Sequence, residues 1–469
     1  MPVTGQLLPG VRQLPTGYNV ANSLRFNGDN FLSRTNPSAT STNDKKGTFS
    51  FWIKRASFPN ESQVLIHQAD SSPKRFALQI ANNDEFIFSI RNDAESVDID
   101  GTTTLDRVYR DVSAWTNFVF NYDTSGGTNG CKLFVNGTEQ ALTYSNTLPQ
   151  NFVMVQNTSS FANHTIGRDS LNSSNFWTGY MTEVMFVDGQ QLAPTEFGEY
   201  DSDSPTIWKP KDITGIDVGN LGYYLDFENS SALGTDAKSV GNFSTTNCAA
   251  IDQSTDTCTN NFATLNPLNP IVHDFEEANL RIDATASNWD SAFSTIGASS
   301  GKWYFELKFL SKSSEPLVRS AIGVVDARGQ TQFATNEVGY TVSGAEGDSV
   351  GYNGNGSNNI KKNDSAQYSG TNWNVNDIIC MAVDLDNGAV YFRVNDSAWL
   401  NSGDPTSGST KTGAVTITTG ETYVFGGTAY DASTEWQFNF GAPSFSISSG
   451  NADANGHGNF EYAVPSGYF

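Results

Sequence analysis

Short runs in which apolar and polar residues alternate recur along most of the chain. Phe118 and Phe120 alternate with polar neighbours, and this period of two is typical of a β-strand with one face in a core. A loop rich in Gly, Ser, Asn and Thr follows, and alternation resumes over residues 131–135 before an Asn-Gly turn at 136–137. The pattern predicts an antiparallel hairpin over residues 115–137.

A second hairpin is predicted much later, over residues 377–396. Ile379, Met381 and Val383 alternate inward, and residues 390–394 return in the same phase. The intervening Asn387-Gly388 favours a two-residue turn, in which both central residues need positive φ. Two such hairpins so far apart predict two β domains in one chain.

Similar short runs fill the remaining sequence, and long amphipathic helices are hard to find. Short strands at this spacing, with turns between them, favour an all-β chain built from sandwiches or jelly rolls. In the first half these runs are 23–28, 47–55, 62–68, 75–92, 164–169 and 176–199, and in the second half they are 301–309, 320–326, 338–344, 349–356, 423–431 and 435–445.

The length of 469 residues exceeds one ordinary core and favours two domains of about 200 residues. We expect an N-terminal arm at residues 1–21, where Pro and Gly are frequent, and a first sandwich at 22–203. A polar connector is expected at 204–270 and a second sandwich at 271–469. The arm either docks on another subunit or is a mobile end, and both interpretations stay open.

The formal net charge is −23, with a pI near 4.4. Binding to nucleic acid is therefore disfavoured, since release of counterions from phosphates needs a basic face, and so is attraction to an anionic membrane. The N-terminal residues lack both a basic region and an apolar stretch long enough for a signal or a membrane span. We expect a soluble protein made without classical export.

The four cysteines divide into two pairs. Cys131 and Cys380 stand in phase with the inward positions of the hairpins, which predicts that both are small buried hydrophobes. Cys248 and Cys258 could meet, although a reduced pair is expected in a protein without an export signal. A zinc site is not expected, because no Cys-x-x-Cys occurs.

Motifs in both halves resemble known families. "TFSFWIKR", "KLFVNG", "IGR" and "FWTGYMTEVMFVDGQQL" resemble, in this order, the laminin-G-like, concanavalin A-like jelly roll over about residues 22–200. "GKWYFE", "DLDNGAVYF" and "FNFG" resemble the landmarks of a SPRY domain, another concanavalin-like sandwich. The resemblance implies two tandem concanavalin A-like jelly-roll β-sandwiches, laminin-G-like and then SPRY-like.

The order of these motifs, and the segment between them, also resembles large virion proteins of marine bacteriophages. That resemblance implies a structural protein of the virion, made in the cytoplasm of the host bacterium and placed in a tail fibre, head fibre or other appendage. The implied partners are other virion proteins and a glycan or protein of the host surface. A homo-oligomer is expected, and a trimer is the usual state of a fibre.

An enzymatic role is not expected. Bacterial glucanases with this sandwich place a Glu-x-Asp-x-x-Glu or Glu-x-Asp-x-Glu run on one strand, and neither run occurs here. The nearest carboxylate pairs are Asp98 with Asp100, which share one strand face, and Asp384 with Asp386. Asp384 and Asp386 flank a hairpin turn, and capping of that turn explains them.

Calcium is the one cofactor that the resemblance to laminin-G-like domains suggests. Laminin-G-like domains often hold this ion at the rim of the sandwich, with carboxylate and carbonyl oxygens as ligands. By their turn contexts, Asp84, Asp98, Asp100 and Asp123 are the candidate ligands, and ordinary loop aspartates explain them equally well.

Ligand binding on this architecture is expected from loops that expose aromatic and amide side chains, because rings stack on sugars and amides bind hydroxyls. The candidates are Tyr352, Asn353, Asn355, Trp399 and Trp177. Loops that merely cover a sandwich edge are the alternative explanation for these residues.

The sequence thus predicts an adhesin for a host-surface glycan or protein. A purely structural capsid or tail component without a ligand is the first alternative, and a glycan depolymerase is the second. The two hairpins are expected to be scaffold, with function in loops elsewhere.

Overall fold

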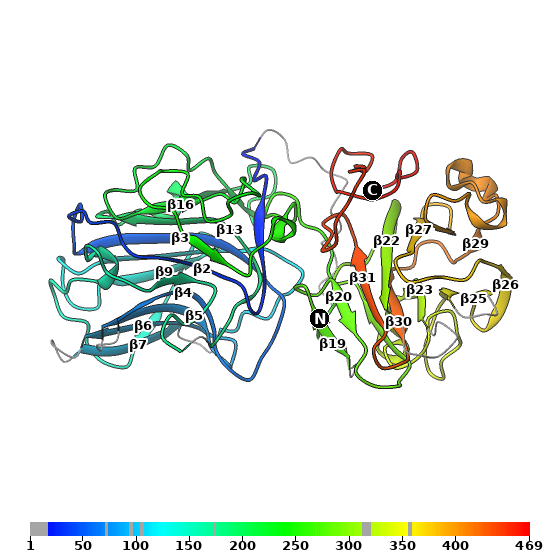
Figure 1. The fold of residues 1–469 in the computed structure, drawn as a ribbon, viewed down its shortest axis with the longest axis horizontal. Helices are drawn as coiled ribbons and strands as arrows, with labels where there is room; N and C mark the ends of the chain where they lie inside the picture. The colour runs from blue at the N-terminus through cyan, green and yellow to red at the C-terminus, as the bar shows by residue number, and fades with distance from the viewer. Residues whose placement is uncertain are drawn as a thin grey trace. The chain divides into compact units, whose positions relative to one another are not determined.

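A computed structural model describes residues 17–70, 74–92, 97–103, 107–172, 174–269, 271, 273–311, 320–354 and 359–469. The chain forms two compact units, and we call Leu14–Asn261 the N-terminal unit and Phe262–Phe469 the C-terminal unit. Each is a sandwich of antiparallel sheets, so the predicted all-β architecture is confirmed (Figure 1). Within the described residues no helix has the length and apolar character needed to cross a membrane.

Two large sheets build the N-terminal unit. The first has the order β10-β9-β8-β3-β13-β1-β18, with β16 also paired to β13. Its strands are β10 (Thr138–Gln140), β9 (Cys131–Val135), β8 (Thr116–Asp123), β3 (Lys46–Arg55), β13 (Thr178–Asp188), β1 (Ser23–Asn27), β18 (Gln253–Ser254) and β16 (Tyr223–Leu225).

The second sheet has the order β11-β7-β6-β5-β4-β12-β2-β17. Its strands are β11 (Leu142–Tyr144), β7 (Val97–Thr103), β6 (Phe86–Asn92), β5 (Arg75–Ile80), β4 (Gln63–Ala69), β12 (His164–Ile166), β2 (Phe31–Arg34) and β17 (Ser244–Thr246). A separate pair, β14 (Gly198–Tyr200) and β15 (Trp208–Pro210), and the 3-10 turns η2 (Val155–Asn157), η3 (Pro194–Glu196) and η4 (Ala250–Asp252) complete the unit.

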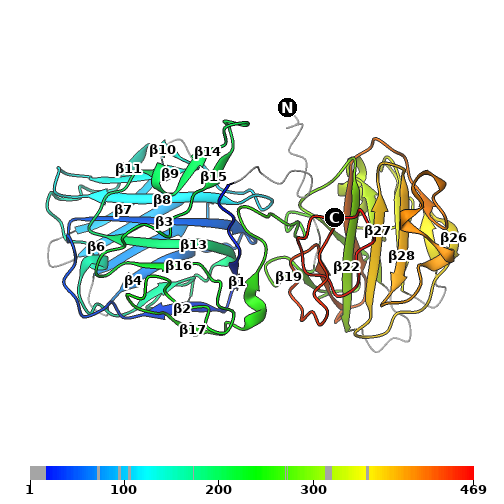
Figure 2. The ribbon, with the colours of Figure 1, turned by 90° about the horizontal axis from the view of Figure 1, so that it is seen from above.

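Two sheets also build the C-terminal unit (Figure 2). One has the order β19 (Asp274–Glu276), β20 (Arg281–Asp283), β31 (Glu435–Asn439), β22 (Lys302–Ser311), β27 (Ile378–Asp384), β28 (Ala389–Val394) and β29 (Val415–Thr416). The other has the order β21 (Asp290–Phe293), β30 (Tyr423–Ala429), β23 (Ser320–Asp326), β24 (Ser349–Asn353), β25 (Asn359–Lys362) and β26 (Ser365–Ser369). The helical turns are η5 (Ala327–Gly329), α1 (Gln330–Phe333), η6 (Leu400–Ser402) and η7 (Pro405–Thr410).

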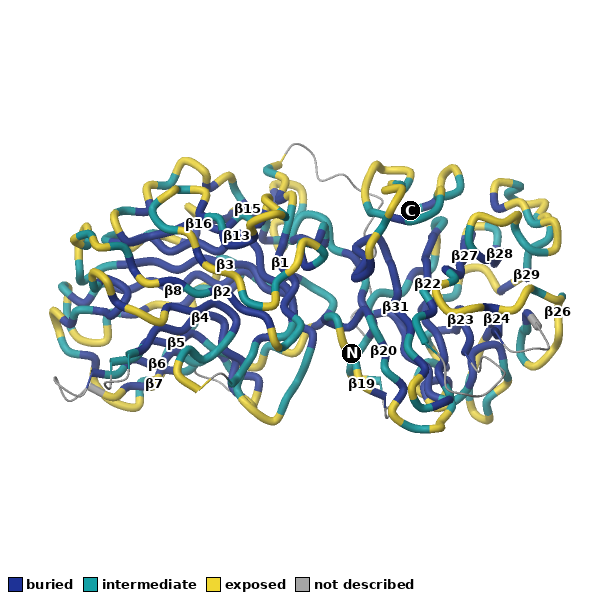
Figure 3. The backbone as a smooth tube through the Cα atoms, viewed as in Figure 1, coloured by how far each residue is buried: buried dark blue, intermediate teal, exposed yellow. Residues whose placement is uncertain are grey.

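The inward alternation read from the sequence is found in both cores. Phe118 and Phe120 of β8 lie in the core of the N-terminal unit, and Trp303 and Phe305 of β22 lie in that of the C-terminal unit. Cys131 and Cys380 are buried, as predicted, but only Cys131 faces the core between the sheets, because Cys380 alternates with the inward Ile379 and Met381 and lies on the outer face. Cys248 and Cys258 are free thiols. Figure 3 shows burial concentrated along the strands of each unit.

The opposite face of the first sheet is buried as well, which the period of two did not predict. Val119 of β8 and Met185 of β13 pack on that face against Ile213 and Val218 from the segment after β13. Burial of a second apolar face adds to the hydrophobic stabilisation of the sheet, and it requires a layer of chain outside the sandwich.

That layer overturns the prediction of a connector at 204–270. Strands β16, β17 and β18 pair with β13, β2 and β1 of the N-terminal unit, while Leu265 already belongs to the core of the C-terminal unit. The polar composition of this region suggested a linker, but its few apolar residues lie where they can cover the sheet.

Buried ion pairs fasten the same segment. The Asp256 carboxylate accepts a hydrogen bond from Lys54 Nζ at 2.7 Å and one from the indole N–H of Trp115 at 2.8 Å. Asp252 likewise lies 3.2 Å from Arg25 Nη2, and all four charged side chains are buried. A buried charge is tolerated when it is paired and hydrogen-bonded, so these contacts fix the register of the late segment on early strands.

The C-terminal unit covers its outer face in the same way. Tyr304 and Cys380 on that face pack against Phe445, Phe460 and Tyr468 from the last residues of the chain. Tyr304 and Glu306 alternate along β22 with the core residues Trp303 and Phe305, so both face outward, yet both are buried beneath this tail.

A buried carboxylate holds the tail in place. Glu306 accepts hydrogen bonds from the backbone N–H groups of Glu461 at 3.0 Å and Tyr462 at 2.9 Å, and from Asn439 and Tyr304. Burial raises the pKa of Glu306 against the opposing effect of these hydrogen bonds.

The two Asn-Gly turns differ. Asn136 and Gly137 both have positive φ and join β9 directly to β10, as a two-residue turn requires. At the second hairpin, β27 and β28 pair as far as Asp384 and Ala389, so four residues form the loop and only Gly388 among them has positive φ. The predicted two-residue turn there is therefore wrong, although the hairpin itself is confirmed.

The first part of the predicted arm, residues 1–16, lies outside the described residues. Its last part contacts its own unit, where the Tyr18 hydroxyl lies 3.3 Å from Glu183 Oε2. Glu183 sits at an irregularity of β13 with a φ of 53°, and Tyr224 also donates to its carboxylate at 2.8 Å. Burial is the largest influence on this carboxyl and raises its pKa to about 7.

The ion pair at Asp256 predicts the effect of its removal. In the Asp256→Ala variant Lys54 stays buried without that carboxylate, and we expect a loss of about 3–5 kcal/mol in the free energy of unfolding of the N-terminal unit. Urea denaturation measures it. The control is Glu139→Ala, which breaks an exposed pair with Lys132 and costs less than about 1 kcal/mol. An equal, small loss in both variants would contradict a role of residues 204–261 in this unit.

The Glu183 carboxyl predicts a pH dependence of stability. Its folded pKa of about 7 lies above the ordinary 4.5, so its protonated form stabilises the fold below pH 4.5, and that contribution disappears as the pH rises towards 7. The difference amounts to about 3 kcal/mol. Urea denaturation from pH 4.5 to 7.5 should show this decline in the wild type and not in Glu183→Gln, with Glu139→Gln as the exposed control. A parallel decline in all three proteins would contradict the assignment.

Candidate functional site

Three of the predicted ligand-binding residues are buried, which corrects their assignment. Trp177 and Tyr352 have exposed fractions of 0% and belong to the two cores, and Asn353 lies buried in β24. Tyr352 also donates its hydroxyl hydrogen to the carbonyl of Thr371. The "GYNGNG" stretch that suggested a flexible loop begins as a paired strand, while Asn355 lies outside the described residues.

Trp399 is half-buried at the outer-face cluster of the C-terminal unit. Its ring lies edge-on to Tyr391, with centroids 6.4 Å apart, and the Arg393 guanidinium lies 4.9 Å from its centroid. These packing contacts account for the partial burial of the Trp399 indole. A role for Trp399 in ligand binding stays a prediction.

The predicted calcium ligands do not meet in one place. Asp84 is buried between two guanidinium groups, with Arg55 Nη1 at 2.6 Å and Arg110 Nε at 3.0 Å. A carboxylate engaged by two arginines lacks a free oxygen for a metal, so the assignment of Asp84 to calcium is wrong.

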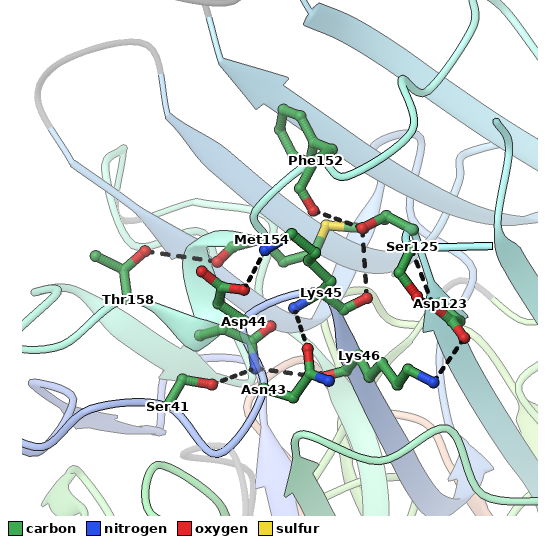
Figure 4. Close-up of polar contacts among 12 residues, drawn as sticks. Ser41, Asn43, Asp44, Lys45, Lys46, Asp123, Ser125, Phe152, Met154 and Thr158 are labelled. Carbon is green, nitrogen blue, oxygen red and sulfur yellow. Dashed lines mark hydrogen bonds and ion pairs between the residues drawn. The ribbon is translucent and has the colours of Figure 1, made fainter. Parts of the chain in front are cut away.

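Asp123 is engaged as well (Figure 4). Lys46 Nζ lies 2.9 Å from its carboxylate, and the N–H and hydroxyl of Ser125 donate to it at 2.9 and 2.6 Å. Asp98 and Asp100 are exposed on β7, where Asp98 lies 3.9 Å from Arg91 and Asp100 accepts a hydrogen bond from Ser89. Among the described residues, no three His, Cys, Asp or Glu side chains gather where they could hold a metal ion.

A pocket of about 160 Å³ opens at one end of the N-terminal sandwich. Its floor is the edge of the core, where Ile53, Ile80, Phe118 and Val135 meet. Its mouth is polar and includes side chains from the segment before β8. An apolar floor with a few converging polar groups is the usual composition of a small-molecule site, although this volume suits one sugar residue better than a drug-sized ligand.

The Asp84 carboxylate organises the mouth. It bridges Arg55 and Arg110, and the ring of Phe58 lies under both guanidinium groups, at 4.5 and 5.4 Å from its centroid. Asp84 has a φ of 68°, and its carbonyl accepts a hydrogen bond from the N–H of Tyr109. Through these contacts β3 and the turn before β6 hold the 107–111 segment in position.

The hairpin β8–β9 and the adjoining β10 also contribute to the mouth of the pocket. Arg107 donates to Gln140 of β10 at 2.6 Å, and Asn136, at the turn before β10, lines the pocket. The hairpin was expected to be scaffold alone, and it contributes directly to this site. Asp111 accepts hydrogen bonds from the N–H and hydroxyl of Ser113 at 2.8 and 2.6 Å, which occupies one of its two carboxylate oxygens.

Tyr109 forms an aromatic wall of the pocket. Its ring lies edge-on to Phe118 with centroids 5.0 Å apart, and burial raises the pKa of its hydroxyl to about 12. The phenol therefore stays protonated at neutral pH. The Tyr109 oxygen is buried and has no hydrogen-bond partner within the described part of the chain.

The sequence contains one local signal for this site. "RVYR", Arg107 to Arg110, places two arginines around a tyrosine in a chain with 27 basic and 50 acidic residues. Two arginines around an aromatic ring mark a candidate site for polar ligands, and Asp106 and Asp111 on either side balance their charge in the sequence. Arg55 could not be found this way, because it reaches the pocket only through the packing of β3.

A family profile matches part of the N-terminal unit. The profile of the concanavalin A-like lectin/glucanases superfamily, of the laminin-G type, matches residues 27–196. This stretch is therefore similar to concanavalin A-like domains. The match ends before β16, β17 and β18, which complete the unit in the structure. A comparison with curated protein sequences gives no match.

Solved structures with partial similarity include the SPRY domain of human HERC1, at 11% identity and a TM-score of 0.29 over 37% of this chain and 96% of that one. The CBM40 module of the Ruminococcus gnavus IT-sialidase, bound to α2,3-sialyllactose, is similar at 16% identity and a TM-score of 0.26, over 35% of this chain and 93% of that one. Domain 4 of the arabinanase AbnA from Geobacillus stearothermophilus shares 16% identity at a TM-score of 0.28, over 37% and 73%.

The ion pairs of the candidate aspartates predict how the protein responds to calcium. Because Asp84 and Asp123 are engaged by basic side chains, neither calcium chloride nor EDTA should shift the melting temperature of the N-terminal unit. Differential scanning calorimetry measures the shift, with magnesium chloride as the ionic-strength control. A melting temperature that rises with calcium and not with magnesium would contradict this expectation.

Proposed function

We propose that the protein is a glycan-binding component of a bacteriophage particle and that it binds without catalysis. The observation that carries the proposal is the pocket at the end of the N-terminal sandwich. Its aromatic wall at Tyr109 suits the apolar face of a sugar, and its arginine, aspartate and asparagine side chains suit hydroxyl groups. The superfamily matched by residues 27–196 contains lectins, which supports the same role.

The placement on a virion rests on the sequence resemblance to marine phage proteins. Attachment to a host favours many copies of a weak site, because linked sites add through their effective concentration. The pocket belongs entirely to one unit of one chain, so every copy in a fibre or other appendage carries its own site.

A glycan array tests the binding. Purified wild-type protein should bind a subset of bacterial surface oligosaccharides, and Ala114→Trp should abolish that binding, since Ala114 is a half-buried residue of the pocket and an indole there fills it. The control is Thr143→Trp, at an exposed position of β11. Binding that survives Ala114→Trp would move the site elsewhere, and no binding of the wild type would refute the proposal.

Mass spectrometry and cryo-EM of purified phage particles test the location. The protein should be present in an appendage, and its absence from the particle would contradict the virion assignment. Release of reducing ends from a bound polysaccharide would contradict binding without catalysis.

A further inference from the structure

The pocket reverses the charge balance of the chain. Three arginines and one aspartate line it, in a protein whose acidic residues outnumber its basic ones by 50 to 27. Arg55 is buried and is matched by Asp84, so its charge is used within the protein. Arg107 and Arg110 are exposed at the mouth, and their charges are available to a ligand.

Arg110 is positioned as a two-pronged donor. Its Nε is 3.0 Å from Asp84, which anchors the guanidinium, and the Phe58 ring supports its plane. Its side chain is 56% exposed, and among the described residues its ion pair is made through Nε, which leaves both Nη groups for a ligand. The two Nη groups of a guanidinium match the two oxygens of a carboxylate.

The carboxylates beside the pocket are both engaged within the protein. Asp111 accepts both hydrogen bonds from Ser113 at one carboxylate oxygen, which draws that group towards its own backbone. Asp84 shares its single charge between two guanidinium groups. Among the described residues, three guanidinium groups thus stand against the two carboxylates of Asp84 and Asp111, and an anion gains from this excess at short range, where screening by salt is weak.

We propose that the pocket recognises an acidic sugar, a uronic or ulosonic acid, whose carboxylate pairs with the Nη groups of Arg110. The sugar ring then lies on the apolar floor beside Tyr109. This inference rests on the proposed glycan binding and adds to it the chemical class of the ligand. A carboxylate distinguishes such a sugar from the neutral hexoses that share its ring.

Matched sugars test the inference with the wild-type protein. The array carries oligosaccharides that end in glucuronic, galacturonic or sialic acid, each beside its methyl ester and its neutral parent, and sulfate esters form a separate arm. Because a charge-assisted pair contributes about 1.5–3 kcal/mol, acids should bind about ten-fold to a hundred-fold more tightly than their methyl esters.

Variants assign the preference to Arg110. Arg110→Gln should lose the ten-fold preference for acids, and Arg110→Lys should recover little of it, because an ammonium lacks the fork. The control is Lys132→Gln, which removes a similarly exposed charge (51% against 56%) from β9 of the same unit, outside the pocket. Circular dichroism confirms that each variant is folded.

The outcomes separate the two proposals. Equal binding of acids and methyl esters by the wild type would overturn the acidic-sugar assignment and leave glycan binding intact. Stronger binding of sulfate esters than of carboxylates, or full recovery by Arg110→Lys, would also overturn it. No binding of any glycan would refute the proposed function itself.

Discussion

The central strands of both sandwiches carry apolar side chains on two faces, and much of the structure outside the sheets follows from that constraint. One face forms the core between the sheets, and the other needs a separate cover. In the N-terminal unit the residues after β13 supply that cover, and in the C-terminal unit the last residues of the chain supply it. Both segments are poor in regular structure because their apolar residues are sparse and placed singly.

The buried positive charges named above for the N-terminal unit are each neutralised by a nearby carboxylate. Each buried cation of the N-terminal unit described above has a carboxylate partner: Lys54 with Asp256, Arg25 with Asp252 and Arg55 with Asp84. Asp84 differs because it also serves Arg110, so one negative charge is set against two positive ones. The pocket owes its positive character to this sharing and not to a basic surface, which the chain as a whole does not have.

The sequence was sufficient for the architecture, because alternation records which side chains face a core. It could not locate the connector correctly, since a covering segment and a linker are both polar and irregular, and only the partners of Tyr224 or Asp256 distinguish them. The prediction of exposed ligand-binding residues was wrong because composition alone does not show whether an aromatic side chain is exposed. Trp177 and Tyr352 stand in stretches whose composition is typical of loops, but both rings are buried in the cores of their units. The pocket combines Arg55, Tyr109 and Asn136 from three distant parts of the chain, which no local pattern shows.

The link between Lys54 and Asp256 has a consequence for synthesis of the protein. Asp256 leaves the ribosome some two hundred residues after its partner, and β18 pairs with β1 across a similar interval. Until then Lys54 lacks its carboxylate partner, and the outer face of β13 stays uncovered in a nascent sandwich without β16, β17 and β18. The N-terminal unit therefore completes its fold late, when the C-terminal unit is already being made, and a fragment that stops at the end of the superfamily match would keep an apolar face open to aggregation.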